Sequence, residues 1–439
     1  MIRRFILTVG LICAGFSVHA AAEIQEVESP GGFKAWLVEE PSIPFVALEI
    51  RFLGGASLDA PGKRGATNLM VGLLEEGAEE LDARGFAEAR DGLAAQFRYD
   101  VGDDTVRISA KFLTETRDEA VDLLRASLVS PRFDEADIDR VRAQVISAIR
   151  SDATDPDEIV GDAFYGLVFG DHPYGTNQNG TLDSVTALTR DDIVAAHRAA
   201  LAQDRVYVAA AGDISAEELG VLLDKLFLGL PDTGAPQPAD IEVSTTSGVT
   251  VVPFDTPQSV AIFGHKGMKR DDPDFFAAYV LNTIFGGGGF EARLMNEVRE
   301  KRGLTYGVYS YLAPREHAEL MLGRVASAND RMAETIQVIR DEWAKMATEG
   351  ATPEELERAK TYLTGAYPLR FDGNAPIAKI LVGMQLDGLS PDYVFTRNDK
   401  IEAVTLEDVK RVAGELMKPE ELRFVVVGQP EGIESTVGQ

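Results

Sequence analysis

Apolar and polar positions follow two different periods along this chain. Residues 33–52 alternate on either side of a turn at Pro41 and Pro44, which is typical of two strands. Residues 68–76 instead place apolar side chains at helical spacing, on Leu69, Met70, Leu73 and Leu74. Further helices and strands follow without strict alternation, which predicts an α+β fold.

The pattern starts again after residues 231–248, which are rich in Pro, Gly, Ser and Thr and indicate a linker. The distance from Thr189 to Gly212 equals that from Thr405 to Gly428, twenty-three residues, and each pair encloses a helix and a strand. Residues 133–140 resemble residues 351–358 at nearly the same offset. A duplication follows. We predict two homologous halves, 23–230 and 249–437, each a mostly antiparallel sheet with helices on one face.

Composition and charge exclude some classes of partner. Hydrophobic residues make up 45% of the 439 residues, which is enough for more than one large core. The formal net charge of −28 argues against nucleic acid, because a phosphate backbone needs a basic protein surface.

The N-terminus predicts export. Arg3 and Arg4, an apolar stretch over residues 5–16 and small residues around Ala20 are typical of a signal peptide at residues 1–20. The only cysteine, Cys13, falls within it, so the mature chain would have no disulfide. No other stretch is long and apolar enough to span a membrane. We expect a periplasmic protein.

The residues with the clearest chemical potential lie between 285 and 310. A glycine run, Gly286, Gly287, Gly288 and Gly289, is followed by a helical segment with Leu294, Met295 and Val298 on its apolar side. Arg299 then stands at a helix end, and Tyr306 at the start of a strand. A guanidinium fork and a phenolic O–H aimed at one point would hold a carbonyl or stabilise an oxyanion. The alternative is a solvated arginine and a core tyrosine.

This segment, with its REKxGLxY pattern after a glycine turn and an Arg293–Leu294 pair, resembles the Arg/Tyr-pair segment of the M16 metallopeptidase family (pitrilysin, insulinase and mitochondrial processing peptidase). The resemblance covers nearly the whole mature chain. It implies two homologous α+β halves around a cavity that admits unfolded peptides or small proteins. Arg299 and Tyr306 would bind the scissile carbonyl and stabilise the tetrahedral intermediate, and the glycines at 286–289 would let backbone approach the substrate.

Catalytic M16 members carry H-x-x-E-H, whose histidines bind zinc and whose glutamate activates water. Aligning that pattern with residues 65–77 places Asn68, Val71 and Gly72 at the three positions. The third ligand, a downstream glutamate, would fall near residues 146–149, where none is present. Histidines elsewhere have no second histidine within helical reach, and each is expected to be structural. We therefore predict no metal or other cofactor in this chain.

The sequence thus retains one part of a peptidase site and lacks the other. In the resembled family, some enzymes are heterodimers in which one chain carries zinc and the other the Arg/Tyr pair. We predict the non-catalytic subunit of an exported zinc peptidase, inactive alone, with a zinc-bearing M16 subunit as its partner. One alternative is a peptide-binding or scaffold pseudo-peptidase, and another is an independent enzyme of unrecognised chemistry.

Overall fold

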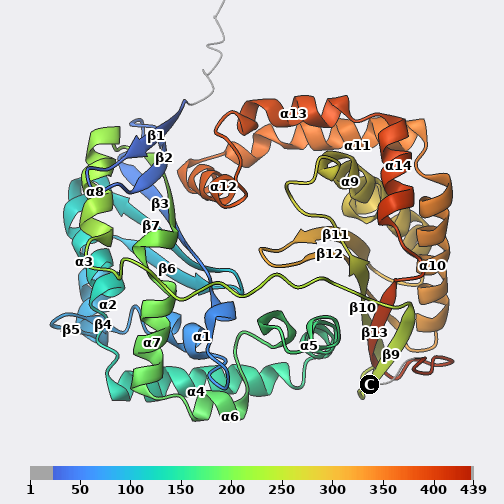
Figure 1. Cartoon of the computed structure of the whole chain (residues 1–439), viewed down its shortest axis with the longest axis horizontal. Helices are drawn as coiled ribbons and strands as arrows, with labels where there is room; N and C mark the ends of the chain where they lie inside the picture. Colours follow the sequence, from blue (N-terminus) through green and yellow to red (C-terminus); the bar gives the residue numbers. More distant parts are fainter. Residues whose placement is uncertain (1–22, 437–439) are drawn as a thin grey trace, which may run out of the picture.

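The computed structural model describes residues 23–436, which form two halves on opposite sides of the molecule (Figure 1). The predicted signal peptide lies outside the described residues. The first sheet has the strand order β1-β2-β8-β3-β7-β6, and the second β11-β12-β10-β13-β9. The strands of the first half are β1 Ile24–Glu28, β2 Lys34–Glu39, β3 Phe45–Leu53, β4 Gly77–Ala78, β5 Leu81–Asp82, β6 Gln96–Val101, β7 Thr105–Leu113 and β8 Val206–Gly212. Those of the second half are β9 Gly248–Pro253, β10 Gln258–Lys266, β11 Val308–Pro314, β12 Glu319–Ala328 and β13 Arg423–Gly428.

Helices occupy most of the chain between the strands. In the first half these are α1 Ala66–Gly72, α2 Ala83–Gly92, α3 Arg117–Val129, α4 Glu135–Asp152, α5 Pro156–Phe169, α6 Leu182–Thr186, α7 Arg190–Ala200 and α8 Ala216–Phe227. In the second half they are α9 Phe275–Asn282, α10 Met332–Glu349, α11 Pro353–Ala366, α12 Asn374–Leu386, α13 Tyr393–Ala403 and α14 Leu406–Leu416. The expected α+β class with mostly antiparallel sheets is confirmed. No helix among residues 23–436 has the length and hydropathy needed to cross a membrane.

The two sheets share one topology over five strands, and β1 is an additional edge strand of the first. In the first, β8 pairs antiparallel with β3 and parallel with β2; in the second, β13 pairs antiparallel with β10 and parallel with β9. Both central strands end on a glycine with positive φ, 136° at Gly212 and 144° at Gly428. A Cβ would lie 2.2 Å from the Phe45 carbonyl oxygen at the first position and 2.4 Å from Ser259 Oγ at the second. Both the backbone conformation and the lack of space therefore require glycine.

One face of each sheet is covered by helices of the same half. In the first half, Leu48 and Ile108 of the sheet and Leu223 of α8 belong to one buried core. In the second, Phe263 and Phe424 stack with ring centroids 5.1 Å apart, and Trp343 of α10 packs edge-on against Phe263. Aromatic pairs of this kind add to the free energy gained by burial alone.

The other face of each sheet is covered by a helix from the opposite half. α5 lies against β10 and β13, and α12 lies against β2, β3 and β8 (Figure 1). The first contact buries Val160, Phe164, Val425 and Val427, among others, and the second buries Trp36, Ala209, Leu381 and Val382. The sequence predicted helices on only one face of each sheet. It did not predict that a helix from the opposite half would cover the other face.

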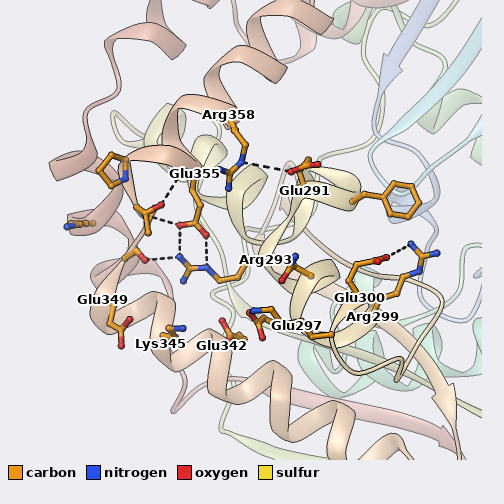
Figure 2. Close-up of a pocket in the computed structure, with 18 residues that line it drawn as sticks. Glu291, Arg293, Glu297, Arg299, Glu300, Glu342, Lys345, Glu349, Glu355 and Arg358 are labelled. Carbon is orange, nitrogen blue, oxygen red and sulfur yellow. Dashed lines mark hydrogen bonds and ion pairs between the residues drawn. The ribbon is translucent and has the colours of Figure 1, made fainter.

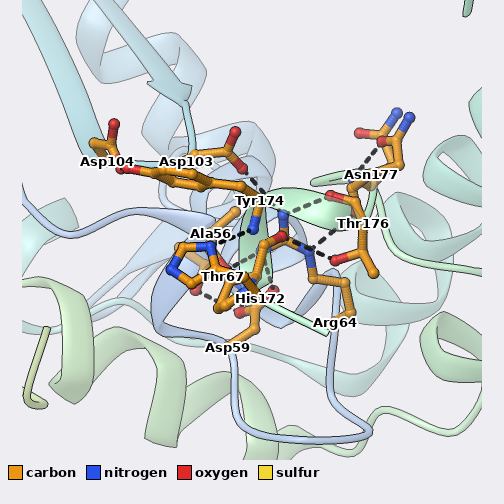
Figure 3. A network of polar contacts seen from close by, with 12 residues as sticks. Ala56, Asp59, Arg64, Thr67, Asp103, Asp104, His172, Tyr174, Thr176 and Asn177 are labelled. Atoms are coloured by element: carbon orange, nitrogen blue, oxygen red, sulfur yellow. Dashed lines mark hydrogen bonds and ion pairs between the residues drawn. The ribbon is translucent and has the colours of Figure 1, made fainter. Parts of the chain in front are cut away.

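Polar contacts reinforce the junction between the halves. Arg315, at the turn between β11 and β12, donates from Nη1 to Asp103 Oδ2 over 3.1 Å, and Arg64 Nη2 donates to the other oxygen of Asp103 over 3.0 Å. The Tyr174 hydroxyl donates to Asp104 and accepts from the backbone N–H of His317 at 3.2 Å. Figure 3 shows Tyr174, Asp103, Asp104 and Arg64 converging on this point. Burial raises the pKa of Tyr174, so this phenol remains a donor at neutral pH.

The segment predicted to be a linker is held to both halves. Gln237 donates from Nε2 to the Leu53 carbonyl over 3.1 Å in the first half. The Ile241 N–H donates to the His317 carbonyl over 2.9 Å in the second. The connection is thus a strap with defined contacts rather than a free coil.

Shortening a buried side chain of α12 tests the helix exchange. Leu381 is 1% exposed against the first sheet, so Leu381→Ala should destabilise the chain by about 2–5 kcal/mol through lost burial and a cavity. Urea unfolding measures the change. Val221→Ala on α8 is the control, because Val221 is 62% exposed and should alter stability by less than about 0.5 kcal/mol. Equal, small effects would contradict the packing role of α12.

Candidate functional site

The glycine run follows α9 and turns the chain back against β11. It spans a π-helical turn, η5 (Thr283–Gly287), and a 3-10 turn, η6 (Gly289–Glu291). A Cβ on Gly286 would lie 2.3 Å from Ser310 Oγ, one on Gly287 2.7 Å from Asn282 Nδ2, and one on Gly288 2.6 Å from the Thr283 carbonyl oxygen. These three glycines allow the chain to pack against itself.

Gly289 differs from the other three glycines. Its φ is 63°, and a Cβ there would meet nothing within 4 Å. Of the run, this is the position whose backbone faces open space, and it is therefore the one that could lie against a ligand.

Arg299 lies on a second π-helical segment, η7 (Met295–Glu300), a geometry often found at functional sites. As predicted, Leu294, Met295 and Val298 are buried in the core of the second half. The Arg299 guanidinium lies 3.0 Å from Glu300 Oε1 and 4.8 Å from the centroid of the Phe290 ring. Arginine has five N–H donors, so one ion pair leaves others available.

The neighbouring basic side chains are paired with a different carboxylate from that of Arg299. Lys301 Nζ lies 2.5 Å from Glu297 Oε1, and Arg302 Nη1 lies 2.8 Å from Glu297 Oε2. One carboxylate therefore binds both cations. Arg299 is the basic residue of this cluster that faces Phe290 and the glycine turn.

Tyr306 stands on a turn that is fixed from both sides. The Leu304 N–H donates to the Val298 carbonyl over 3.0 Å, and Thr305 Oγ1 donates to the Ala326 carbonyl over 2.6 Å. Between these anchors and β11, Tyr306 is 88% exposed, and its hydroxyl has no hydrogen-bond partner among residues 23–436. The alternative of a core tyrosine is therefore wrong.

An open cleft of about 970 Å³ lies beside η6, between η7, the end of α10 and the start of α11 (Figure 2). Phe290 and Arg299 line it, and Tyr306 does not. Inside it, Arg293 forms a two-pronged ion pair with Glu355, Nε to Oε1 at 3.0 Å and Nη2 to Oε2 at 2.7 Å. Arg293, known from the sequence only as part of a motif, thus joins the Arg299 segment to α11.

Two residues of this site were not singled out from the sequence, Phe290 and Glu355. Phe290, 67% exposed, covers one face of the Arg299 guanidinium, and Glu355 forms the ion pair with Arg293. An isolated aromatic residue after a glycine run was the available signal for Phe290. Glu355 lies some sixty residues away, so no local pattern could have paired it with Arg293.

The helix aligned with the metal motif, α1, does not offer zinc ligands. Asn68 donates from Nδ2 to Asn179 Oδ1 over 3.1 Å, and Asn179 donates to Asp152 over 3.1 Å. Val71 is buried, and Gly72 has no side chain. Zinc prefers thiolate, imidazole and carboxylate, so an amide, an alkyl group and a hydrogen do not fit it. In the described part of the chain, no three His, Cys, Asp or Glu side chains are arranged to hold a metal ion.

The structure brings together two histidines that are far apart in sequence. The His172 and His317 rings lie 6.4 Å apart at the junction of the halves, and His317 Nδ1 lies 3.1 Å from Asp240 Oδ1. His265 instead accepts from the Trp343 indole N–H over 3.2 Å, and burial lowers its pKa to about 4. His265 is thus a neutral acceptor inside the second half.

Comparison with known proteins agrees with this description. Residues 187–363 match the family model described as Peptidase M16 inactive domain. An uncharacterized zinc protease of Streptomyces coelicolor is 28% identical over 91% of this chain and 88% of its own length. The non-peptidase homolog YmxG of Helicobacter pylori is 24% identical over 97% of this chain and 98% of its own.

A solved structure extends the match to three dimensions. The crystal structure of a peptidase M16 inactive domain from Pseudomonas fluorescens is 27% identical, with a TM-score of 0.87, and the match covers 95% of this chain and 99% of that one. Fold, motif and relatives agree: residues 187–363 match the M16 family model described as inactive, and over most of its length the chain is similar to proteins of the M16 peptidase family.

Proposed function

We propose that this chain is the non-catalytic subunit of an exported M16-type zinc peptidase and that it supplies Arg299 and Tyr306 to a zinc-bearing partner subunit. The observation that carries the proposal is the 88% exposed phenol of Tyr306 on an anchored turn, seven residues after Arg299. Nothing within the described chain uses that hydroxyl. The same chain has Asn68, Val71 and Gly72 where zinc ligands would be needed.

The chemistry asked of the two residues is hydrogen-bond donation. Attack on a peptide carbonyl puts negative charge on its oxygen, and donors already held in place stabilise that charge most. Leu304 and Thr305 fix the turn, so Tyr306 loses little conformational freedom when it binds. Phe290 and Glu300 likewise restrain Arg299.

The proposed substrates are unfolded peptides or small proteins. Gly289 leaves a stretch of backbone open beside Arg299, where an extended peptide can approach without meeting a side chain. The formal net charge of −28 favours the approach of basic peptides over acidic ones.

Removing either donor should lower turnover in the assembled complex. We expect Arg299→Ala and Tyr306→Phe each to depress kcat on the order of 10²–10³, the cost of losing one oxyanion donor. Assembly should persist because both side chains are outside the cores. The measurement is peptide hydrolysis by the purified heterodimer, with complex formation checked separately by size-exclusion chromatography.

Matched variants separate a chemical role from a surface effect. Arg302→Ala removes a nearby arginine that is bound to Glu297, and Tyr362→Phe removes the hydroxyl of another exposed tyrosine, on α11. Both should retain turnover. Full activity in Arg299→Ala and Tyr306→Phe would reject the shared site and leave the peptide-binding or scaffold role.

The isolated chain should neither hydrolyse peptides nor retain stoichiometric zinc. Its α1 donor set lacks a thiolate, an imidazole and a carboxylate, the groups that zinc needs. Metal analysis after dialysis, alongside a peptide assay, tests this. One tightly bound zinc per chain, lost on substituting Asn68, would show that the alignment with the metal motif is wrong.

A further inference from the structure

A second cleft, of about 640 Å³, lies where α12 leaves the second half to cover the first sheet. Its walls come from α9, α12, α13 and the short turn η8 (Pro368–Phe371). The cleft is separate from the Arg299 turn, since neither Arg299 nor Tyr306 lines it. Nothing proposed above assigns it a role.

Aromatic rings and arginines are already stacked in this cleft. The Arg270 guanidinium carbon lies 4.2 Å from the Phe275 ring centroid, and its Nη2 donates to the Tyr393 hydroxyl over 2.9 Å. The Arg397 guanidinium carbon lies 4.3 Å from the Tyr367 ring centroid. Stacking holds these side chains in place, so a ligand entering between them meets a prearranged apolar and cationic wall.

The cleft reverses the charge balance of the chain. The whole sequence has 71 acidic and 43 basic side chains, yet the residues lining this cleft include four basic ones and a single carboxylate, Asp387. Asp387 already faces Arg270, with Oδ2 3.6 Å from its Nε. Burial also raises the pKa of the Asp387 carboxyl.

Two of the basic side chains are unused. Arg370 on η8 and Lys379 on α12 have neither a side-chain hydrogen bond nor an ion pair within residues 23–436. At the floor, Tyr367 is 7% exposed, and its hydroxyl has no hydrogen-bond partner in the same part of the chain. A buried donor without a partner costs free energy that a ligand oxygen can recover.

We propose that this cleft binds an organic anion in which a carboxylate is attached to a flat apolar group. Arg370 and Lys379 would pair with the carboxylate, and the rings of Phe276, Tyr279 and Tyr393 would contact the apolar group. Inorganic phosphate would pair with the two basic side chains but would make no apolar contact with the aromatic rings. The proposal does not depend on the peptidase role.

N-acetyl-phenylalanine and its amide are the matched probes, because the amide replaces the charged carboxylate by a neutral group of similar size and shape. Calorimetry on the full-length mature chain should show saturable binding of the acid, with the amide at least tenfold weaker. Inorganic phosphate should also bind at least tenfold more weakly than the acid. A short peptide ending in phenylalanine tests which kind of carboxylate the cleft accepts. If the peptide binds with an affinity comparable to that of the acid, the ligand is the C-terminus of a peptide; if it does not bind, the ligand is a small free acid.

Variants locate the binding. The Arg370→Gln/Lys379→Gln double variant should lose at least tenfold in affinity for the acid, since hydrogen bonds to charged groups are stronger than those between neutral groups. Both side chains are exposed, so circular dichroism should show an unchanged fold. Arg84→Gln, on α2 of the other half, is the control and should bind as wild type.

Several outcomes overturn the proposal. These are absence of saturable binding, equal affinity for the acid and its amide, equal affinity for phosphate and the acid, or a folded double variant with unchanged affinity.

Discussion

Each sheet of this protein has two apolar faces, and the chain can cover only one of them with helices of the same half. The remaining faces, which carry Trp36 and Leu320 among others, would be costly to expose, at about 25 cal/mol per Å² of apolar surface. The exchange of α5 and α12 meets that requirement on both sides at once. Together with the polar contacts at the junction, this packing places the two halves relative to each other.

Local sequence pattern predicted much of the architecture but could not predict this exchange. The repeated Thr-to-Gly interval identified the helix and strand that end at Gly212 and Gly428, because glycine is required there by backbone geometry in both halves. The apolar stripe of α12 shows that the helix is buried on one side. The stripe does not indicate which sheet the helix packs against, since Leu381 could be buried equally well against either sheet. The choice of sheet depends on how well the two surfaces fit together, and the spacing of apolar residues does not specify that fit.

The candidate site likewise has features that the sequence could predict and features that it could not. The burial of Leu294 and Val298 could be predicted from helical spacing. The exposure of Tyr306 could not be predicted, since a tyrosine entering a strand is as often buried as exposed. It depends on Thr305, whose hydroxyl reaches the next strand and holds the turn outward. A rigid support beneath an exposed functional group is what oxyanion stabilisation demands, because little reorganisation then remains for the reaction itself.

The helix exchange also changes what the covalent connection between the halves has to do. Each half contributes one helix that packs on the sheet of the other half. The strap across residues 231–248 therefore mainly ensures that one copy of each half is present per molecule. After a single cut in that strap, we expect the two halves to stay associated, because both helix contacts would remain. Two polypeptides divided there would each carry the surface that recognises the other. Division of one gene into two is therefore an evolutionary step that this architecture can tolerate.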